Sequence, residues 1–219
     1  NLKWILMPFW LEKIYFCRNM ETVFYKTIKA PSQGNYKEKG SKFLSFAFPV
    51  SSESEVKEYL QKLRKEYYDA THHVYAYRIG SDKKFFRCSD DGEPSNSSGP
   101  PVLGQIQSFD LTNILIVVVR YFGGTKLGVS GLIHAYRSAA ADAIRNAEIV
   151  ETIDKKIIIV SFPYQNIGEV MKIIKNEGLE IQNSFFENIS SIKVSIPIFD
   201  IERITNKLLT IEGVRTFQE

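Results

Sequence analysis

The chain has 219 residues, of which 44% are hydrophobic and 24% charged, and its formal net charge is +3. These proportions are typical of a folded globular protein and argue against a disordered or multispanning membrane chain. The charge is uneven: from Asp154 onward 8 Lys/Arg face 9 Asp/Glu, a net of −1, whereas the preceding part has 20 against 16, a net of +4. The two cysteines, Cys17 and Cys88, form neither a disulfide framework nor a CxxC pair, so we expect a reducing, cytoplasmic location.

Residues 1–16 are apolar and aromatic, but Lys3, Glu12 and Lys13 interrupt them. The uninterrupted run, residues 4–11, is far shorter than the roughly 20 residues that span a bilayer. It also lacks the basic start, clean apolar core and cleavage site of a signal peptide. We therefore expect residues 1–19 to be an extension outside the fold, with Met20 as the natural start, and no membrane association.

Residues 20–152 are predicted to form a first domain of strands and helices. Strands are expected at residues 21–28, 42–50, 73–79, 84–88 and 113–119. Residues 34–40 read as a charged connector and residues 89–101 as a long loop. Helices are expected after Ser52, where Glu55 completes a capping box, at residues 102–109 and at residues 129–147. Because residues 113–119 are apolar without alternation, that strand should be buried on both faces.

The last third of the chain, residues 153–219, has a different order of predicted strands and helices. Strands are predicted at residues 155–163, 179–187, 192–198 and 213–218, and helices at residues 167–176 and 201–209. This order is βαββαβ, the ferredoxin-like arrangement. The whole chain is therefore predicted to be a two-domain α+β protein.

The segment with the most chemical character is RYFGGTKLGVSGLIHAYRSAA, Arg120 to Ala140. A glycine-rich turn lets a ligand approach the backbone, and the following helix N-terminus suits a phosphate. Asp and Glu are absent from residues 111–141, so the stretch is locally cationic. The candidate nucleic-acid contacts are Arg120, Tyr121, Gly123, Gly124, Lys126 and Arg137, with Phe122 and Tyr136 as further stacking candidates.

The turn has a second interpretation, in which its glycines serve only a sharp reversal and tight packing. It matches neither GxxxxGK[ST] nor GxGxxG, so no nucleotide cofactor is expected.

A second set of polar residues is expected around the same surface, namely one of His72 and His73 together with Arg87, Asp90, Asp91 and Glu93. The three carboxylates could bind a cation, act as acid and base, pair with arginines of the Gly-rich turn, cap a helix, or form a solvated turn. Their spacing matches no EF-hand loop, and no metal site is expected. The two adjacent histidines should point to opposite faces of a strand.

Three of these motifs, in this order, closely resemble the YigZ/IMPACT family: ATHHVYAYRIG (70–80), SDDGEP (89–94) and VVRYFGGTKLGVSGL (118–132). The resemblance runs from about Met20 to the C-terminus. It implies a first domain folded like domain four of elongation factor G and the second domain of a small-subunit ribosomal protein. It implies a ferredoxin-like C-terminal domain similar to domain five of that factor. One departure is that Asn96 and Ser98 stand where the family usually has glycine and alanine; asparagine is the best substitute if the turn needs a positive φ.

The resemblance also implies a setting in translation. Eukaryotic relatives regulate translation through an activator of an initiation-factor kinase, and bacterial members are usually inferred to bind nucleic acid or ribosomes. We therefore expect a protein that binds RNA or the ribosome and acts in the regulation of translation, rather than an enzyme. No cofactor is expected. One alternative is a hydrolase or phosphate-handling enzyme that uses Asp90, Asp91 and Glu93 with a histidine or a metal. Another is a protein-interaction module that presents the sheet of the C-terminal domain to a translation-related protein.

Overall fold

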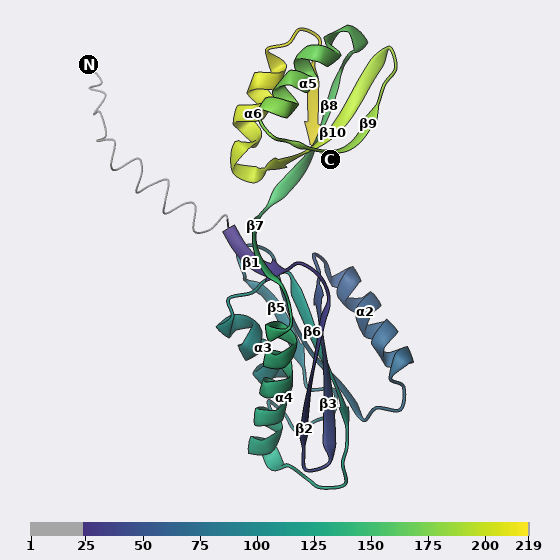
Figure 1. Cartoon of the computed structure of the whole chain (residues 1–219), viewed down its shortest axis with the longest axis vertical. Coiled ribbons are helices and arrows are strands. Elements are labelled where there is room, and N and C mark those ends of the chain that lie inside the picture. The colour runs from purple at the N-terminus through teal and green to yellow at the C-terminus, as the bar shows by residue number, and fades with distance from the viewer. Residues whose placement is uncertain (1–23, 219) are drawn as a thin grey trace, which may run out of the picture. The chain divides into compact units, whose positions relative to one another are not determined.

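The computed structural model describes residues 24–218, which divide into two compact units between Thr152 and Ile153 (Figure 1). The predicted extension, residues 1–19, and the start of the predicted strand 21–28 lie outside the described residues. Within residues 24–218, no helix combines the length and the apolar character that crossing a membrane requires.

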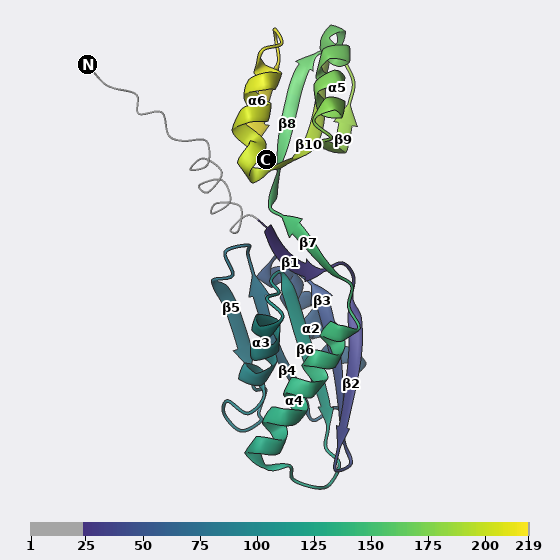
Figure 2. The same cartoon turned by 60° about the vertical axis from the view of Figure 1, so that its left-hand side comes forward.

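The first unit is built on a five-stranded sheet in the order β2-β3-β6-β4-β5, with every neighbouring pair antiparallel. The strands are β2 (Ser32–Glu38), β3 (Ser41–Pro49), β4 (His72–Ile79), β5 (Phe85–Ser89) and β6 (Ile114–Tyr121). Helix α2 (Glu53–Glu66) covers one face, and α3 (Gly99–Ser108) and α4 (Gly128–Arg145) cover the other (Figures 1 and 2). A separate pair, β1 (Phe24–Ile28) and β7 (Ile149–Ile153), joins the two ends of the unit.

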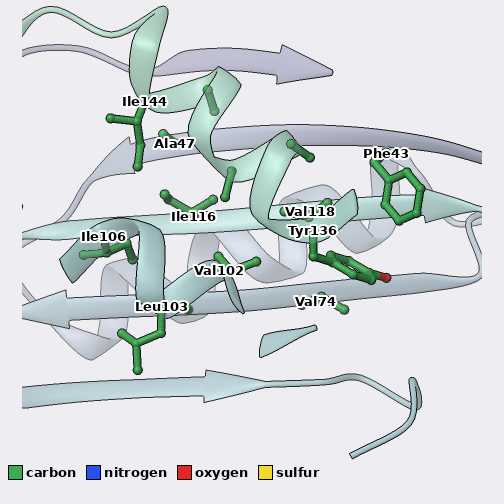
Figure 3. Close-up of a cluster of buried hydrophobic side chains, with 14 of the residues drawn as sticks. Phe43, Ala47, Val74, Val102, Leu103, Ile106, Ile116, Val118, Tyr136 and Ile144 are labelled. Carbon is green, nitrogen blue, oxygen red and sulfur yellow. The ribbon is translucent and has the colours of Figure 1, made fainter. Parts of the chain in front are cut away.

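The central strand β6 organises the core of this unit. Residues 114–119 are fully buried, alternately beneath α4 and beneath α2, which confirms the prediction of a strand buried on both faces. One stripe of α4 is buried against the sheet, formed by Leu132, Tyr136, Ala139 and Ala143. Figure 3 shows Tyr136 beside Phe43 of β3, and their rings meet edge to face with centroids 5.1 Å apart.

The predicted cap of α2 at Ser52 is confirmed, because the Ser52 side chain accepts a hydrogen bond from the Glu55 amide. The Glu55 carboxylate accepts from the amide and hydroxyl of Ser51 instead of from the Ser52 amide that a capping box requires. The following helix, α3, begins three residues before its predicted start at residue 102. Its first turn contains two prolines, which fit the start of a helix because their missing N–H groups would have no intrahelical partner.

The prediction of a connector at residues 34–40 is wrong. Residues 32–38 form strand β2, which pairs with β3 from Ser32 opposite Ala47 to Glu38 opposite Ser41. An edge strand tolerates a polar sequence because only part of it is covered. Gly34 is buried where α4 crosses, and a Cβ there would lie 2.7 Å from the Asp142 carbonyl carbon. Only Lys39 and Gly40, both with positive φ, form the turn.

The second unit is a four-stranded antiparallel sheet in the order β11-β8-β10-β9, with α5 (Ile167–Asn176) and α6 (Ile201–Leu209) packed against the same core. Its strands are β8 (Lys155–Pro163), β9 (Glu180–Phe185), β10 (Ile189–Pro197) and β11 (Arg215–Gln218). The βαββαβ order and the α+β fold class are thus confirmed. Strand β7 was not predicted, because its short sequence follows α4 without a turn signal.

Candidate nucleic-acid interface

Three connections meet at one end of the first unit's sheet. They are the β2–β3 turn, the β6–α4 connection (residues 122–127) and the β5–α3 loop (residues 90–98). Strand register brings them together, because Lys42 lies opposite Tyr121, and Arg120 lies opposite both Phe43 and His72. Most of the predicted site residues therefore collect at this end.

Arg120 lies on β6 and faces α4, where it is only 5% exposed. Its Nη1 donates a hydrogen bond of 2.5 Å to Glu93 Oε1. Its guanidinium also lies 5.4 Å from the ring centroid of Phe43 and 5.7 Å from that of Phe122, distances typical of cation–π contacts. The expectation that Arg120 is a cation on an open surface is therefore wrong, because the sheet buries it and Glu93 neutralises it.

Glu93 is the centre of a buried polar cluster. Its Oε1 accepts hydrogen bonds from Arg120 and, at 2.7 Å, from the hydroxyl of Tyr136, and His72 Nε2 lies 3.8 Å from the same oxygen. Burial and the bond to Glu93 raise the pKa of Tyr136, so its hydroxyl stays a donor. Because Tyr136 is fully buried, it cannot stack on a base, and that expectation is also wrong.

Asp90 caps helix α3. It accepts hydrogen bonds from the backbone amides of Asn96, Ser98 and Gly99 and from the Ser98 hydroxyl. Burial alone would raise the pKa of Asp90, but these hydrogen bonds outweigh it and lower the pKa. Asp90 is therefore held as a carboxylate, satisfying the orphan N–H groups at the start of the helix.

Asp91 turns in a different direction from Asp90 and Glu93. Its two oxygens accept from the His73 amide at 2.6 Å and from Arg64 Nη2 at 2.9 Å. The three carboxylates thus serve pairing and capping, two of the interpretations left open above, and do not converge on one point. Among residues 24–218, no group of three His, Cys, Asp or Glu side chains is placed to hold a metal ion.

The two histidines point to opposite faces of β4, as predicted. His72 faces the Glu93 cluster, and its Nδ1 lies 2.8 Å from the Asp91 carbonyl oxygen. His73 is buried on the α2 face, where burial lowers its pKa and its Nε2 has no partner among the described residues. Arg87 is exposed on β5 and lines no hollow of this end, so His73 and Arg87 do not join the predicted surface.

The glycines of the turn have different roles. Gly123 packs on the β2–β3 turn, where a Cβ would overlap the backbone of Gly40 and Ser41, and its amide donates to the Ser41 hydroxyl. The packing interpretation therefore holds for Gly123. Gly124 and Gly128 have positive φ values of 85° and 72°, and a Cβ at either would meet only open space. A ligand could approach the backbone at these two positions.

A hollow of about 740 Å³ lies on the α2 side of the sheet end. We call it the lysine–aromatic hollow, after five of its lining residues: Lys37, Lys42, Tyr67, Tyr121 and Phe122. No carboxylate is among its lining residues, and the two lysines are exposed and face each other across β2 and β3. Neither lysine forms an ion pair with any residue of 24–218.

Sequence reasoning missed this hollow as a site. Of the residues predicted to contact nucleic acid, Tyr121 and the stacking candidate Phe122 line it, and the Tyr121 hydroxyl donates to Asp69. The sequence does contain a sign of it, because Lys37 and Lys42 lie on either side of the turn formed by Lys39 and Gly40. These two lysines come to lie on one face of the sheet only if the residues before the turn are recognised as a strand.

The remaining two predicted cations lie in separate hollows. Lys126 is exposed and lines a cavity of about 360 Å³ beside Arg120 and the start of α4. Arg137, also exposed, lines another hollow between α3 and α4, together with Asn96 and Gly104. The three predicted cations therefore line two hollows, one shared by Arg120 and Lys126 and the other lined by Arg137.

Comparison with known proteins agrees with the sequence motifs. The family model described as "Impact N-terminal domain" matches residues 39–144. "IMPACT family member in pol 5'region" from Thermus thermophilus is 39% identical over 145 residues, which are 66% of this chain and 78% of that protein. "IMPACT family member YvyE" from Bacillus subtilis is 34% identical over 182 residues, or 83% of this chain and 82% of that protein. The chain belongs to the IMPACT family.

A solved structure described as "Crystal structure of an hypothetical protein" has a TM-score of 0.68 to this chain at 25% identity. It covers 89% of this chain and is itself covered to 97%. The IMPACT match spans β3 to α4, so Lys42, Glu93, Arg120 and Lys126 all lie within the domain that the family shares. In this IMPACT protein Asn96 has a φ of 61°, so asparagine occupies a left-handed position, as its substitution for glycine predicts.

Proposed function

We propose that this IMPACT family member binds RNA through the lysine–aromatic hollow of its first unit, in a role connected with translation. The observation that carries the proposal is the composition of that hollow: two exposed, unpaired lysines beside aromatic rings, with no carboxylate in its lining. Membership of the IMPACT family supports the setting in translation, as the resemblance implies.

The chemistry of such a hollow suits a nucleic-acid backbone. Lysines that neutralise phosphates release condensed counterions, which supplies affinity without sequence preference. Aromatic side chains add stacking of about 1–3 kcal/mol per base. Phe122 is 49% exposed, and the partly buried Tyr121 lines the same hollow. The hollow therefore favours RNA that offers both a phosphate backbone and unpaired bases.

Asp69 accepts a hydrogen bond from the Tyr121 hydroxyl at the edge of the hollow, and the carboxylates of the β5–α3 loop are engaged elsewhere. Glu93 is buried against Arg120, and Asp91 is paired with Arg64. The same pairing leaves the hydrolase alternative without support, because a catalytic carboxylate must be free to meet a substrate or a metal.

The test is the salt dependence of RNA affinity for the wild type and the double variant Lys37→Ala/Lys42→Ala. Removing two phosphate contacts should make the slope of log K against log salt shallower by about 1.4–1.8. The matched control is Lys57→Ala/Lys62→Ala, which removes two exposed lysines of α2 that line no hollow of this site. Circular dichroism would verify that both variants fold.

The control slope should equal the wild-type slope. Equal slopes for all three proteins would refute the placement of the RNA on this hollow. An equal decrease in both double variants would mean that only total charge matters.

A further inference from the structure

We propose that the cavity beside Lys126 binds a 5′-phosphate monoester, carried by the end of an RNA chain or by a free nucleotide. The cavity, here the Lys126 cavity, has a volume of about 360 Å³ and is lined by Glu93, Arg120, Phe122, Lys126, Gly128 and Val129 among others. The RNA-borne form rests on the proposed function and deepens it, because it states which part of the RNA enters the protein.

The first observation is the unused hydrogen-bonding capacity of Arg120. Its side chain is 6% exposed, and among the described residues its hydrogen-bond acceptor is Glu93 Oε1. A guanidinium has five N–H groups, and the buried Nε of Arg120 has no partner within residues 24–218. Buried donors are nearly always satisfied, and Arg120 lines this cavity, so its guanidinium has unused donor capacity beside the cavity.

The second observation is the start of helix α4, which lines the same cavity through Gly128 and Val129. This helix has 18 residues, no side-chain cap at Leu127 and no acidic residue in its first turn. Its first N–H groups and the positive end of its dipole are therefore open to an anion. Gly128 has a positive φ, and no atom stands within 4 Å of where its Cβ would be, so an oxygen can come close to the backbone.

The charge of the cavity is also suitable. Lys126 is exposed and forms no ion pair within residues 24–218, so it adds a free positive charge at the rim. Glu93 lines the cavity as well, but Arg120 neutralises it and Tyr136 donates to the same oxygen. The net balance of the lining is one positive charge plus the helix end, which favours a monoester over a neutral group.

The size and the rim indicate what carries the phosphate. A volume of about 360 Å³ is at the lower end of the roughly 300–1,000 Å³ of ligand pockets, so it admits a small head group rather than a folded nucleic acid. Phe122 lines both this cavity and the lysine–aromatic hollow. A terminal nucleotide could therefore place its phosphate at α4 and its base against Phe122, with the rest of the chain continuing toward Lys42.

The experiment compares three probes by calorimetric titration of the full chain: the oligonucleotide UUUU with a 5′-phosphate, the same oligonucleotide with a 5′-hydroxyl, and uridine 5′-monophosphate. The phosphorylated oligonucleotide should bind at least tenfold more tightly than the hydroxyl form. Val129→Asp should abolish that preference, because it places a carboxylate at the rim; Val129 is 54% exposed, so the fold should tolerate it. Lys126→Ala should reduce the preference, whereas Val129→Asn, which has no charge, should largely keep it.

The outcomes separate the two proposals. Suppose that the two oligonucleotides bind equally well, while Lys37→Ala/Lys42→Ala still makes the salt dependence of RNA affinity shallower. This result would overturn the phosphate site in the Lys126 cavity and would still support RNA binding at the lysine–aromatic hollow. Binding of uridine monophosphate that depends on Lys126, without any oligonucleotide binding, would support the cavity, identify a free nucleotide as its ligand, and defeat the proposed RNA function. A phosphate preference unaffected by both Lys126→Ala and Val129→Asp would overturn the assignment to this cavity.

Discussion

Replacing Glu93 by glutamine should destabilise the first unit strongly. The substitution keeps the shape of the side chain but removes its charge, so the Arg120 guanidinium is left buried without a counter-ion. The side chains of Arg120 and Glu93 are 6% and 3% exposed, and 2.5 Å separates their paired atoms. Breaking a buried pair from one side costs about 3–5 kcal/mol, because the remaining charge is desolvated and uncompensated.

Urea denaturation followed by hydrogen-exchange mass spectrometry would measure this loss and localise it. With a slope of about 2 kcal/mol per molar urea, the midpoint for the first unit should fall by about 2 M. Peptides from β4 and β6 should lose protection, whereas peptides from β8 and β10 should keep it, because they belong to the second unit.

The triple variant Arg120→Leu/Glu93→Leu/Tyr136→Phe separates pairing from packing. It removes both charges of the buried ion pair and the Tyr136 hydroxyl that donates to Glu93, so no buried charge is left without a partner. Most of the stability lost in Glu93→Gln should therefore return. The reasoning is refuted if Glu93→Gln lowers the midpoint no more than Lys57→Ala, an exposed substitution of the same unit.

Two further predictions concern single positions. Gly123→Ala should lower the melting temperature by several degrees, because the added Cβ would overlap the Gly40 backbone. Gly104 lies within α3, and a Cβ added there would have no neighbouring atom within 4 Å, so Gly104→Ala should raise the stability by up to about 1 kcal/mol. Equal melting temperatures for the two variants would contradict this contact. Burial lowers the pKa of His73, so protonation of this side chain favours the unfolded chain. The stability that the neutral His73 contributes to the folded state is complete above the unfolded pKa of about 6.5 and is lost as the pH falls below it. Urea midpoints between pH 7.5 and 5 should therefore decline less in His73→Gln than in the wild type, and parallel declines would exclude this residue.

Elements with strong periodicity were predictable from the sequence, and those defined by their neighbours were not. The run of residues 113–119 and the small-residue helix α4 carry their own burial pattern, and both were predicted correctly. Strand β2 does not, because its sequence SQGNYKE is polar and contains Gly34. Its structure depends on pairing with β3 and on the close approach of α4, neither of which a local pattern contains.

The candidate site shows the same limit. The cationic stretch after β6 is visible in the sequence, but Arg120 and Glu93 are 27 residues apart, so their pairing depends on tertiary structure. A charged residue at the end of an otherwise apolar strand could have indicated a buried partner, because a buried charge needs one. Strand alternation then separates Arg120 and Tyr121 onto opposite faces of the sheet, which divides one predicted surface into the Lys126 cavity and the lysine–aromatic hollow.

Strands β1 and β7 have a consequence for how this unit can be used. They pair with each other, and the Lys29 amide donates to the Glu148 carbonyl, so the chain enters and leaves the first unit at neighbouring points. A domain whose ends lie together can be grafted into a host loop or given new neighbours at either end without opening its sheet. Because the β1–β7 pair holds both ends of this unit together, the domains that precede or follow it in a chain can change without altering the surface that we propose binds RNA.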